Sequence, residues 1–196
     1  RDAYELLETI LEVYDNQEIE SLQALQDILL AESELFELRP ENSWNAIRLL
    51  IKHVDEEGPH QALAQATLAR SFTQLALHFP TELDDEQIEL TAVLEQAFYL
   101  AEQAAHTQPE LADTHAALGQ LLLIHDTKEA TEDAESLFRL SLSHDPEFDP
   151  ARLGLASALY LQGKNVQAQE QIEYLSKKGN TFAGLWSLRA QLSMQQ

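Results

Sequence analysis

Residues 115–146 read HAALGQLLLIHDTKEATEDAESLFRLSLSHDP, and this stretch decides the fold of the chain. Its small and apolar residues recur further along the sequence. Ala134 and Ala168 are 34 residues apart, whereas Leu118 and Leu155 are 37 apart, so the first unit carries three extra residues in its internal turn. A period of this length predicts helical hairpins stacked into a solenoid, because one hairpin cannot bury its apolar face alone.

The spacing of apolar residues predicts about ten helices, and no sustained strand-type alternation is present. We expect them at 3–14, 18–38, 43–56, 60–79, 85–106, 110–125, 129–144, 149–162, 165–178 and 181–196. A longer connection is expected from Pro80, with Asp84 or Asp85 capping the helix that follows it. The expected fold class is therefore all-α.

The repeated residues resemble the tetratricopeptide repeat family. In that family the first helix carries a large residue, Leu, Gly or Ala, and another large residue, and the second carries Ala, an aromatic or aliphatic residue, Ala and a closing Pro. One repeat fills these slots with His115, Leu118, Gly119, Leu122, Ala134, Phe138 and Pro146, and has Ser141 at the second Ala. The next has Leu155, Ala156, Leu159, Ala168 and Ile172, then Leu175 and Asn180 at the last two slots. The preceding repeat has Leu68, Ala69, Phe72, Ala97, Ala101, Ala104 and Pro109.

The resemblance covers residues 60–180 and implies a right-handed α-solenoid of stacked antiparallel hairpins. It divides the chain into divergent N-terminal helices at 1–57, tetratricopeptide-like repeats at 58–180 and a C-terminal capping helix at 181–196. Small side chains in the repeats let helix axes approach closely. We therefore expect Gly119 to tolerate Ala and Ala134 to tolerate Ser, and neither position to accept Leu.

The chain is strongly acidic, with 12 basic and 34 acidic residues and a net charge of −22. Such a polyanion repels phosphate, which argues against binding nucleic acid or an anionic membrane through this segment. The acidic surface either keeps the array soluble or docks a basic partner. No membrane-spanning run or signal peptide is present, so we expect a soluble protein of the bacterial cytoplasm or periplasm. The first residue is Arg rather than Met, which suggests part of a longer chain or a processed product.

The sequence offers little for catalysis or metal binding. It contains no Cys, which excludes disulfides, thiolate nucleophiles and zinc–thiolate sites. Its seven His show no i, i+3 or i, i+4 pair on a helix. Asp145, Glu147 and Asp149 alternate like a calcium loop, but Pro150 and Ala156 stand where that loop needs Gly and Glu. No phosphate loop, nucleophile elbow or dinucleotide fingerprint occurs. We therefore expect no metal, no cofactor and no enzymatic activity.

The resemblance implies that the first helix of each hairpin lines a concave groove. Carried over residue by residue, the groove positions expected to hold a partner are Arg70, Thr73, Gln120, Leu123, Leu153, Ser157, Tyr160 and Gln191. Their mixed chemistry suits an extended or helical peptide held by apolar contacts and hydrogen bonds, with Tyr160 as the anchor. Ala66, Ala116 and Leu153 stand where family members that grip a C-terminal carboxylate have Lys, so such a clamp is not expected.

The favoured function is a non-catalytic protein- or peptide-binding module that acts as an adaptor or scaffold through this groove. An alternative comes from the expected long loop at 80–85 and the stretched turn at 125–129, which resemble the C-terminal helical domains of bacterial winged-helix transcription regulators. That resemblance implies a regulatory or sensory domain of a transcription regulator or another signalling protein. A competing location for the partner is the acidic segment 1–57, where binding would fall steeply with salt.

Overall fold

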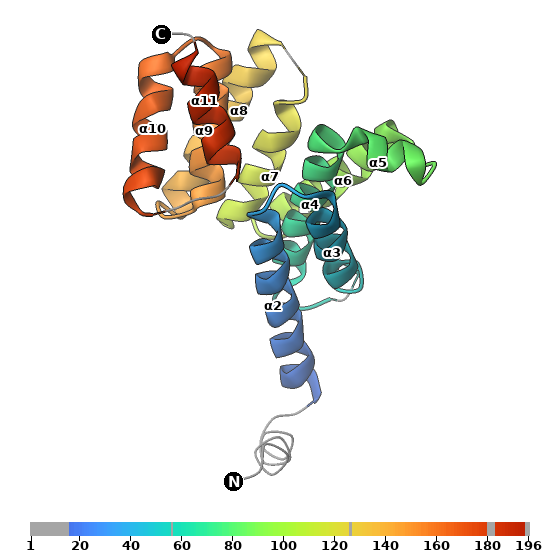
Figure 1. The fold of residues 1–196 in the computed structure, drawn as a ribbon. Helices are drawn as coiled ribbons and strands as arrows, with labels where there is room; N and C mark the ends of the chain where they lie inside the picture. The colour runs from blue at the N-terminus through green and yellow to red at the C-terminus, as the bar shows by residue number, and fades with distance from the viewer. Residues whose placement is uncertain (1–15, 56, 126, 180–182, 195–196) are drawn as a thin grey trace.

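The computed structural model describes residues 16–55, 57–125, 127–179 and 183–194. Within these ranges the chain forms ten helices and no strand, which confirms the all-α fold class (Figure 1). The helices are α2 (Asn16–Leu35), α3 (Pro40–Leu50), α4 (Gln61–His78), α5 (Pro80–Asp85), α6 (Leu90–Thr107), α7 (Ala112–Leu122), α8 (Lys128–His144), α9 (Asp149–Leu161), α10 (Asn165–Lys177) and α11 (Ala183–Ser193). The helix expected at 3–14 and the slot at Asn180 lie outside the described residues.

The helices pair into consecutive hairpins: α2 packs on α3, α4 on α6, α7 on α8, and α9 on α10. The first helices of the hairpins also contact one another in turn, from α2 through α4, α7 and α9 to α11. One face of the array is thus built from first helices alone. This is the stacked helical solenoid that the repeat period predicts.

Several predicted boundaries were wrong, mostly between α3 and α6. Helix α3 ends at Leu50 rather than 56, and the segment after Phe79 is not a loop, because Pro80 occupies the first turn of the short helix α5. Helix α6 begins after Glu89, which makes no side-chain capping bond, so neither Asp84 nor Asp85 caps it. Instead, Gln87 adopts a left-handed conformation with φ of 57°. The chain turns there out of α5, as it commonly does after the end of a helix.

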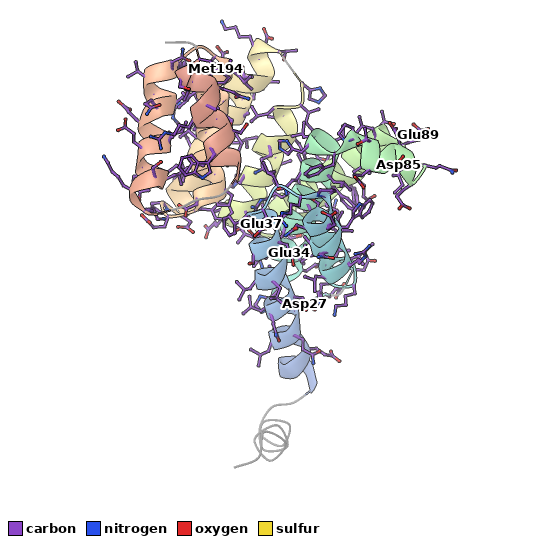
Figure 2. The ribbon with its side chains drawn as sticks, viewed as in Figure 1. Asp27, Glu34, Glu37, Asp85, Glu89 and Met194 are labelled. Atoms are coloured by element: carbon purple, nitrogen blue, oxygen red, sulfur yellow. The ribbon has the colours of Figure 1, made fainter. Side chains whose placement is uncertain are left out.

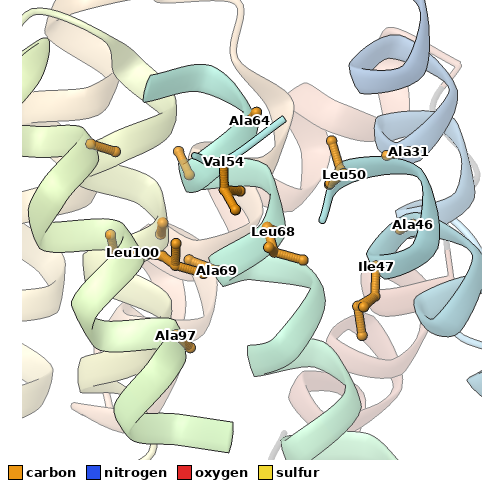
Figure 3. Packing of buried hydrophobic residues seen from close by; sticks show 14 of the residues in the cluster. Ala31, Ala46, Ile47, Leu50, Val54, Ala64, Leu68, Ala69, Ala97 and Leu100 are labelled. Carbon is orange, nitrogen blue, oxygen red and sulfur yellow. The ribbon is translucent and has the colours of Figure 1, made fainter. Parts of the chain in front are cut away.

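Small residues dominate the first of two core clusters, which runs from α2 to α7 (Figure 3). Its fully covered alanines include Ala31 on α2, Ala46 on α3, Ala69 on α4 and Ala97 on α6. Leu68 and Leu100 fill the space that these alanines leave between the helices. Because a methyl group adds little thickness, the axes of α4 and α6 can pack closely along the seam.

The second core cluster is built around one aromatic ring. Phe138 on α8 is fully buried, and its ring lies against Gly119 of α7 and Gly154 of α9. A Cβ atom would lie 2.9 Å from Phe138 Cε1 if added at Gly119, and 2.3 Å from it if added at Gly154. The structure therefore argues against the predicted tolerance of Gly119 for Ala, and it shows Gly154 to be the tighter position.

Two polar contacts join neighbouring elements of this second half. Ser141 donates its hydroxyl hydrogen to the Ala112 carbonyl at 2.7 Å, which gives this buried hydroxyl a partner on α7. Glu135 accepts hydrogen bonds from Gln162 and Lys164, both at 2.8 Å, in the turn that follows α9. Burial raises the pKa of Glu135, but these bonds and the charge of Arg139 outweigh that effect and leave the pKa below its ordinary value.

Candidate functional site

A pocket of about 340 Å³ opens on the face built from first helices. We call it the first-helix pocket. All five first helices or their ends contribute to its wall. The lining residues are Glu32, Leu35, Phe36, Leu38, Arg70, Thr73, Gln74, Leu77, His78, Gln120, Leu123, Pro150, Leu153, Gly154, Ser157, Gly184, Ser187, Leu188 and Gln191. Leucine side chains from each helix alternate with amides and hydroxyls, so the pocket offers apolar contact with scattered polar groups.

Seven of the eight groove residues predicted from the sequence line this one pocket. They are Arg70, Thr73, Gln120, Leu123, Leu153, Ser157 and Gln191. Tyr160 does not line it; this side chain is half-buried and packs against the second core cluster. The structure thus brings the seven together and leaves the expected anchor outside the pocket wall, while their part in binding a partner stays a prediction.

Helix α2 contributes lining residues that sequence reasoning missed, among them Glu32, Leu35 and Phe36. The family resemblance stopped short of residues 1–57, so it offered no register for assigning groove positions there. The signal in the sequence was a group of apolar residues at the end of the helix, Leu35, Phe36 and Leu38. One buried helix face needs fewer apolar residues than this group supplies. Phe36 remains 43% exposed at the pocket wall.

A charged cluster of Glu32, Arg70 and Asp113 connects three successive first helices. Arg70 Nη1 donates to Glu32 Oε1 at 2.6 Å and lies 3.6 Å from Asp113 Oδ1. Thr67 donates its hydroxyl hydrogen to the same Glu32 oxygen at 2.9 Å. Arg70 is only 6% exposed, and its guanidinium lies 5.4 Å from the centre of the Phe148 ring. The cation that the sequence suggested for the groove is therefore already engaged within the protein.

Asp113 is the group of this cluster whose proton affinity changes most. Its burial raises the pKa, the Glu32 charge raises it further, and the Arg70 charge opposes both, so that the pKa lies at about 6. The more distant Asp145 adds to the increase. One guanidinium does not neutralise the carboxylates around it, and Asp113 holds a proton more tightly as a result.

Two hydroxyls of the pocket wall donate their hydrogens to their own helices. Thr73 donates to the Ala69 carbonyl at 2.7 Å, and Ser157 donates to the Leu153 carbonyl at 3.1 Å. Each hydroxyl oxygen keeps acceptor capacity while its hydrogen is used. These two hydroxyls therefore add hydrogen-bond acceptors to the apolar surface of the wall.

Acidic residues lie over several separate surfaces rather than beside the pocket alone. Figure 2 shows Asp27 and Glu34 on α2, Glu37 just after its end, and Asp85 and Glu89 at the far tip between α5 and α6. In the part of the chain that the structure describes, no group of three metal-ligating side chains could hold an ion. Among the same residues, no helix combines the length and the apolar character that crossing a bilayer requires.

A comparison with known protein families found a match in the second half of the array. A tetratricopeptide repeat model matches residues 128–192, which span α8 to α11. No curated protein matches the chain. The matched segment includes the pocket-lining residues of α9 and α11, and tetratricopeptide repeats typically serve as protein-interaction modules.

Proposed function

We propose that this chain is a non-catalytic module that binds a segment of a partner protein in the first-helix pocket and so acts as an adaptor or scaffold. The observation that carries this proposal is the wall of the pocket, to which five first helices contribute in succession. A site extended across successive hairpins suits a chain segment, which can contact each hairpin with a different side chain.

The chemistry of the wall supports the same occupant. The volume of the pocket, about 340 Å³, lies at the lower end of the range of ligand pockets and is enough for a few side chains. Leucines such as Leu123 and Leu153 offer apolar contact, and Gln120 and Gln191 offer amide groups. Buried apolar contacts with a few polar groups around them are the usual composition of a binding interface.

The test is selection of a displayed random peptide library on the immobilised protein, followed by affinity measurement for the recovered peptides. Ser187 is an exposed residue of α11 at the pocket wall, so Ser187→Trp should obstruct the pocket without disturbing the core. We expect this variant to lose binding at least about tenfold, as truncation or blockage of a central contact does. Recovered peptides that bind Ser187→Trp as well as the parent would place the site elsewhere.

Two further variants locate the anchor. Leu153 lines the pocket, so Leu153→Ala removes a contact from its wall. That loss should weaken binding by roughly 1–2 kcal/mol. Tyr160→Ala, at the position predicted from the family pattern, removes a ring outside the pocket wall and should weaken binding less. The reverse order would restore Tyr160 as the anchor. Affinity that collapses with salt and that neither variant changes would favour the acidic segment 1–57 instead.

A further inference from the structure

The cluster of Glu32, Arg70 and Asp113 beside the first-helix pocket carries more negative than positive charge, although only Glu32 and Arg70 line the pocket wall. Glu32 stands on the wall and Asp113 lies behind Arg70, which is the one cation of the cluster. The charge of Asp145 also reaches Asp113. With its carboxylates ionised, the cluster of Glu32, Arg70 and Asp113 has a net charge of −1 and a further carboxylate nearby.

The geometry of Arg70 prevents it from serving an incoming anion. Its Nη1 is already committed to Glu32 at 2.6 Å, and the side chain is buried against the Phe148 ring. The side chain is only 6% exposed and its Nε is buried, so the guanidinium is confined rather than free to rotate toward a ligand. A carboxylate in the pocket would meet Glu32 and would have to displace it from Arg70.

A cation meets the opposite situation. The side chain of Glu32 remains 18% exposed at the wall, and Asp113 lies 3.6 Å from Arg70. That separation is beyond normal hydrogen-bond distance. Leu35, Leu123 and Leu153 line the same pocket as Glu32, and a charge beside apolar surface is screened less than in open water. The negative charge of the cluster and the apolar lining of the pocket together favour a ligand with a cationic group between apolar groups.

We propose that the first-helix pocket selects a peptide segment with one Lys or Arg between apolar side chains, the cationic group being held against Glu32. This inference rests on the proposed function, because it specifies the occupant of the same pocket. The apolar side chains fill the leucine-lined wall, and the cation neutralises the excess negative charge of the cluster. A basic group in this position is also attracted by the charge of the whole chain, −22, which raises the rate of encounter.

Binding of a cation should be linked to the proton of Asp113. The groups facing that carboxyl are Glu32 on α2, Arg70 on α4 and Asp145 after α8. Its pKa of about 6 in the free protein falls when a positive charge arrives, so binding releases a proton. Affinity for the basic peptide should therefore fall as the pH is lowered from about 7.5 to about 5.5. Asp113→Asn should abolish this dependence, whereas Glu170→Gln, at an exposed site on α10, should preserve it.

The experiment selects a displayed random peptide library on the parent, on Glu32→Gln and on Glu170→Gln. Glu170→Gln is the matched control, since it removes the same single charge from an exposed site on α10. We expect Lys or Arg to be enriched at one position with the parent and with Glu170→Gln, and not with Glu32→Gln. In a recovered peptide, changing that Lys to Gln should weaken binding to the parent about five- to tenfold, as loss of a charged hydrogen bond does, with far less effect on Glu32→Gln.

The outcomes separate this inference from the proposed function. Recovery of peptides that Ser187→Trp does not affect would overturn the proposed function and this inference together. Peptides that depend on the pocket but lack a basic residue, or whose basic residue is not coupled to Glu32, would overturn this inference alone. Melting temperature and circular dichroism check that each variant is folded. If Glu32→Gln fails to fold, the parent alone decides: pocket-dependent peptides with no enriched Lys or Arg, or whose Lys→Gln change leaves binding to the parent unchanged, would overturn the inference.

Discussion

The two halves of the array build the same hairpin from different side chains. In the first core cluster, the fully covered positions between α4 and α6 are largely alanines, and none of its described aromatic residues is buried. In the second, Phe138 occupies the centre and Gly119 and Gly154 make room for its ring. Close approach of two helices can be reached by small residues on both sides, or by a ring on one side and glycine on the other.

This difference shows how a family pattern and a fold are related. The family match covers residues 128–192, where Ala134, Phe138 and Ala168 fill the repeat slots. The α4–α6 hairpin has Ala101 in the slot that holds Phe138 in the later repeat, and α5 is inserted between its helices. Its packing nevertheless continues the same row of first helices. The architecture depends on the space between helices, and several residue combinations fill that space.

The largest difference we expect concerns buried carboxylates on neighbouring helices. Asp113 on α7 has its pKa raised from 3.8 to about 6, so its contribution to stability is present below pH 3.8 and is lost as the pH rises through 6. A shift of that size corresponds to as much as roughly 3 kcal/mol. In the parent, the free energy of unfolding should fall between about pH 4 and pH 7 because Asp113 ionises, and in Asp113→Asn this fall should be absent. Denaturant unfolding at each pH measures it.

Glu135 on α8 is the opposite case and serves as the comparison. Its pKa is lowered from 4.5, so its contribution is present above pH 4.5 and is lost as the pH falls through the lower value of the folded state. In Glu135→Gln, the free energy of unfolding should fall less steeply as the pH drops below 4.5, and its pH dependence near neutrality should not change. If the two variants changed the pH dependence over the same pH range, the assignment of opposite electrostatic roles to α7 and α8 would be wrong.

The next largest effect tests whether the alanine-lined contact between α4 and α6 is packed as tightly as the matching position on α8. Ala97 on α6 and Ala134 on α8 occupy the same slot of successive hairpins, and both are fully buried. Leucine at either position should lower the free energy of unfolding by about 1–3 kcal/mol through overpacking. Chemical denaturation with circular dichroism measures both. A parent-like stability for Ala97→Leu alone would show that the α4–α6 hairpin packs more loosely than the matched segment.

Glycine replacements examine the ring at the centre of the second cluster. Gly154→Ala places a Cβ atom 2.3 Å from Phe138, whereas Gly119→Ala gives a contact of 2.9 Å. Displacing the buried ring should outweigh the gain in helix propensity at Gly154, for a net loss of about 1–2 kcal/mol, and Gly119→Ala should lose less. Gly58→Ala is the control, because a Cβ there meets nothing within 4 Å. Thermal melts that rank Gly119→Ala below Gly154→Ala would contradict this packing.

The sequence predicted the parts of the fold that repeat. Periodicity located α4, α8, α9 and α10 within one residue at each end, because apolar residues at helical spacing must face the same core. It failed at α5, since a six-residue helix is too short to show a period and depends on Pro80 at its first turn. Periodicity also failed at the start of α6. The chain turns there through the left-handed conformation of Gln87, which a glutamine in the sequence does not indicate.

The site was predictable to the extent that its residues follow helix register. Seven of the predicted residues line one pocket wall because positions three or four apart on a helix face the same way. Tyr160 followed the same rule and lies at the last turn of α9, beyond the residues that line the pocket. The pairing of Arg70 with Glu32 and Asp113 joins residues 38 and 43 positions away in the chain. No local pattern indicates such pairs, because only the stacking of three helices brings them together.

The smallest effect we expect separates a hydroxyl that joins two helices from one that bonds within its own helix. Ser141 stands in a slot where the family pattern has Ala, and its hydroxyl donates to the Ala112 carbonyl of α7 at 2.7 Å. Ser71 is equally buried, but it donates to the Thr67 carbonyl one turn back in α4 at 2.8 Å. Ser141→Ala should lose about 1 kcal/mol of unfolding free energy, the usual worth of a buried hydrogen bond.

Ser71→Ala should change stability by less than about 0.5 kcal/mol, because the bond it removes is local and Ala favours the helix. Both changes delete one oxygen atom from a fully buried site, so the loss of volume is matched and the comparison isolates the contact between helices. Denaturant unfolding of the two variants in parallel measures the difference. Equal stabilities would mean that the hydroxyl of Ser141 is only tolerated in its slot, and that Phe138 and its glycine neighbours hold α7 against α8 without it.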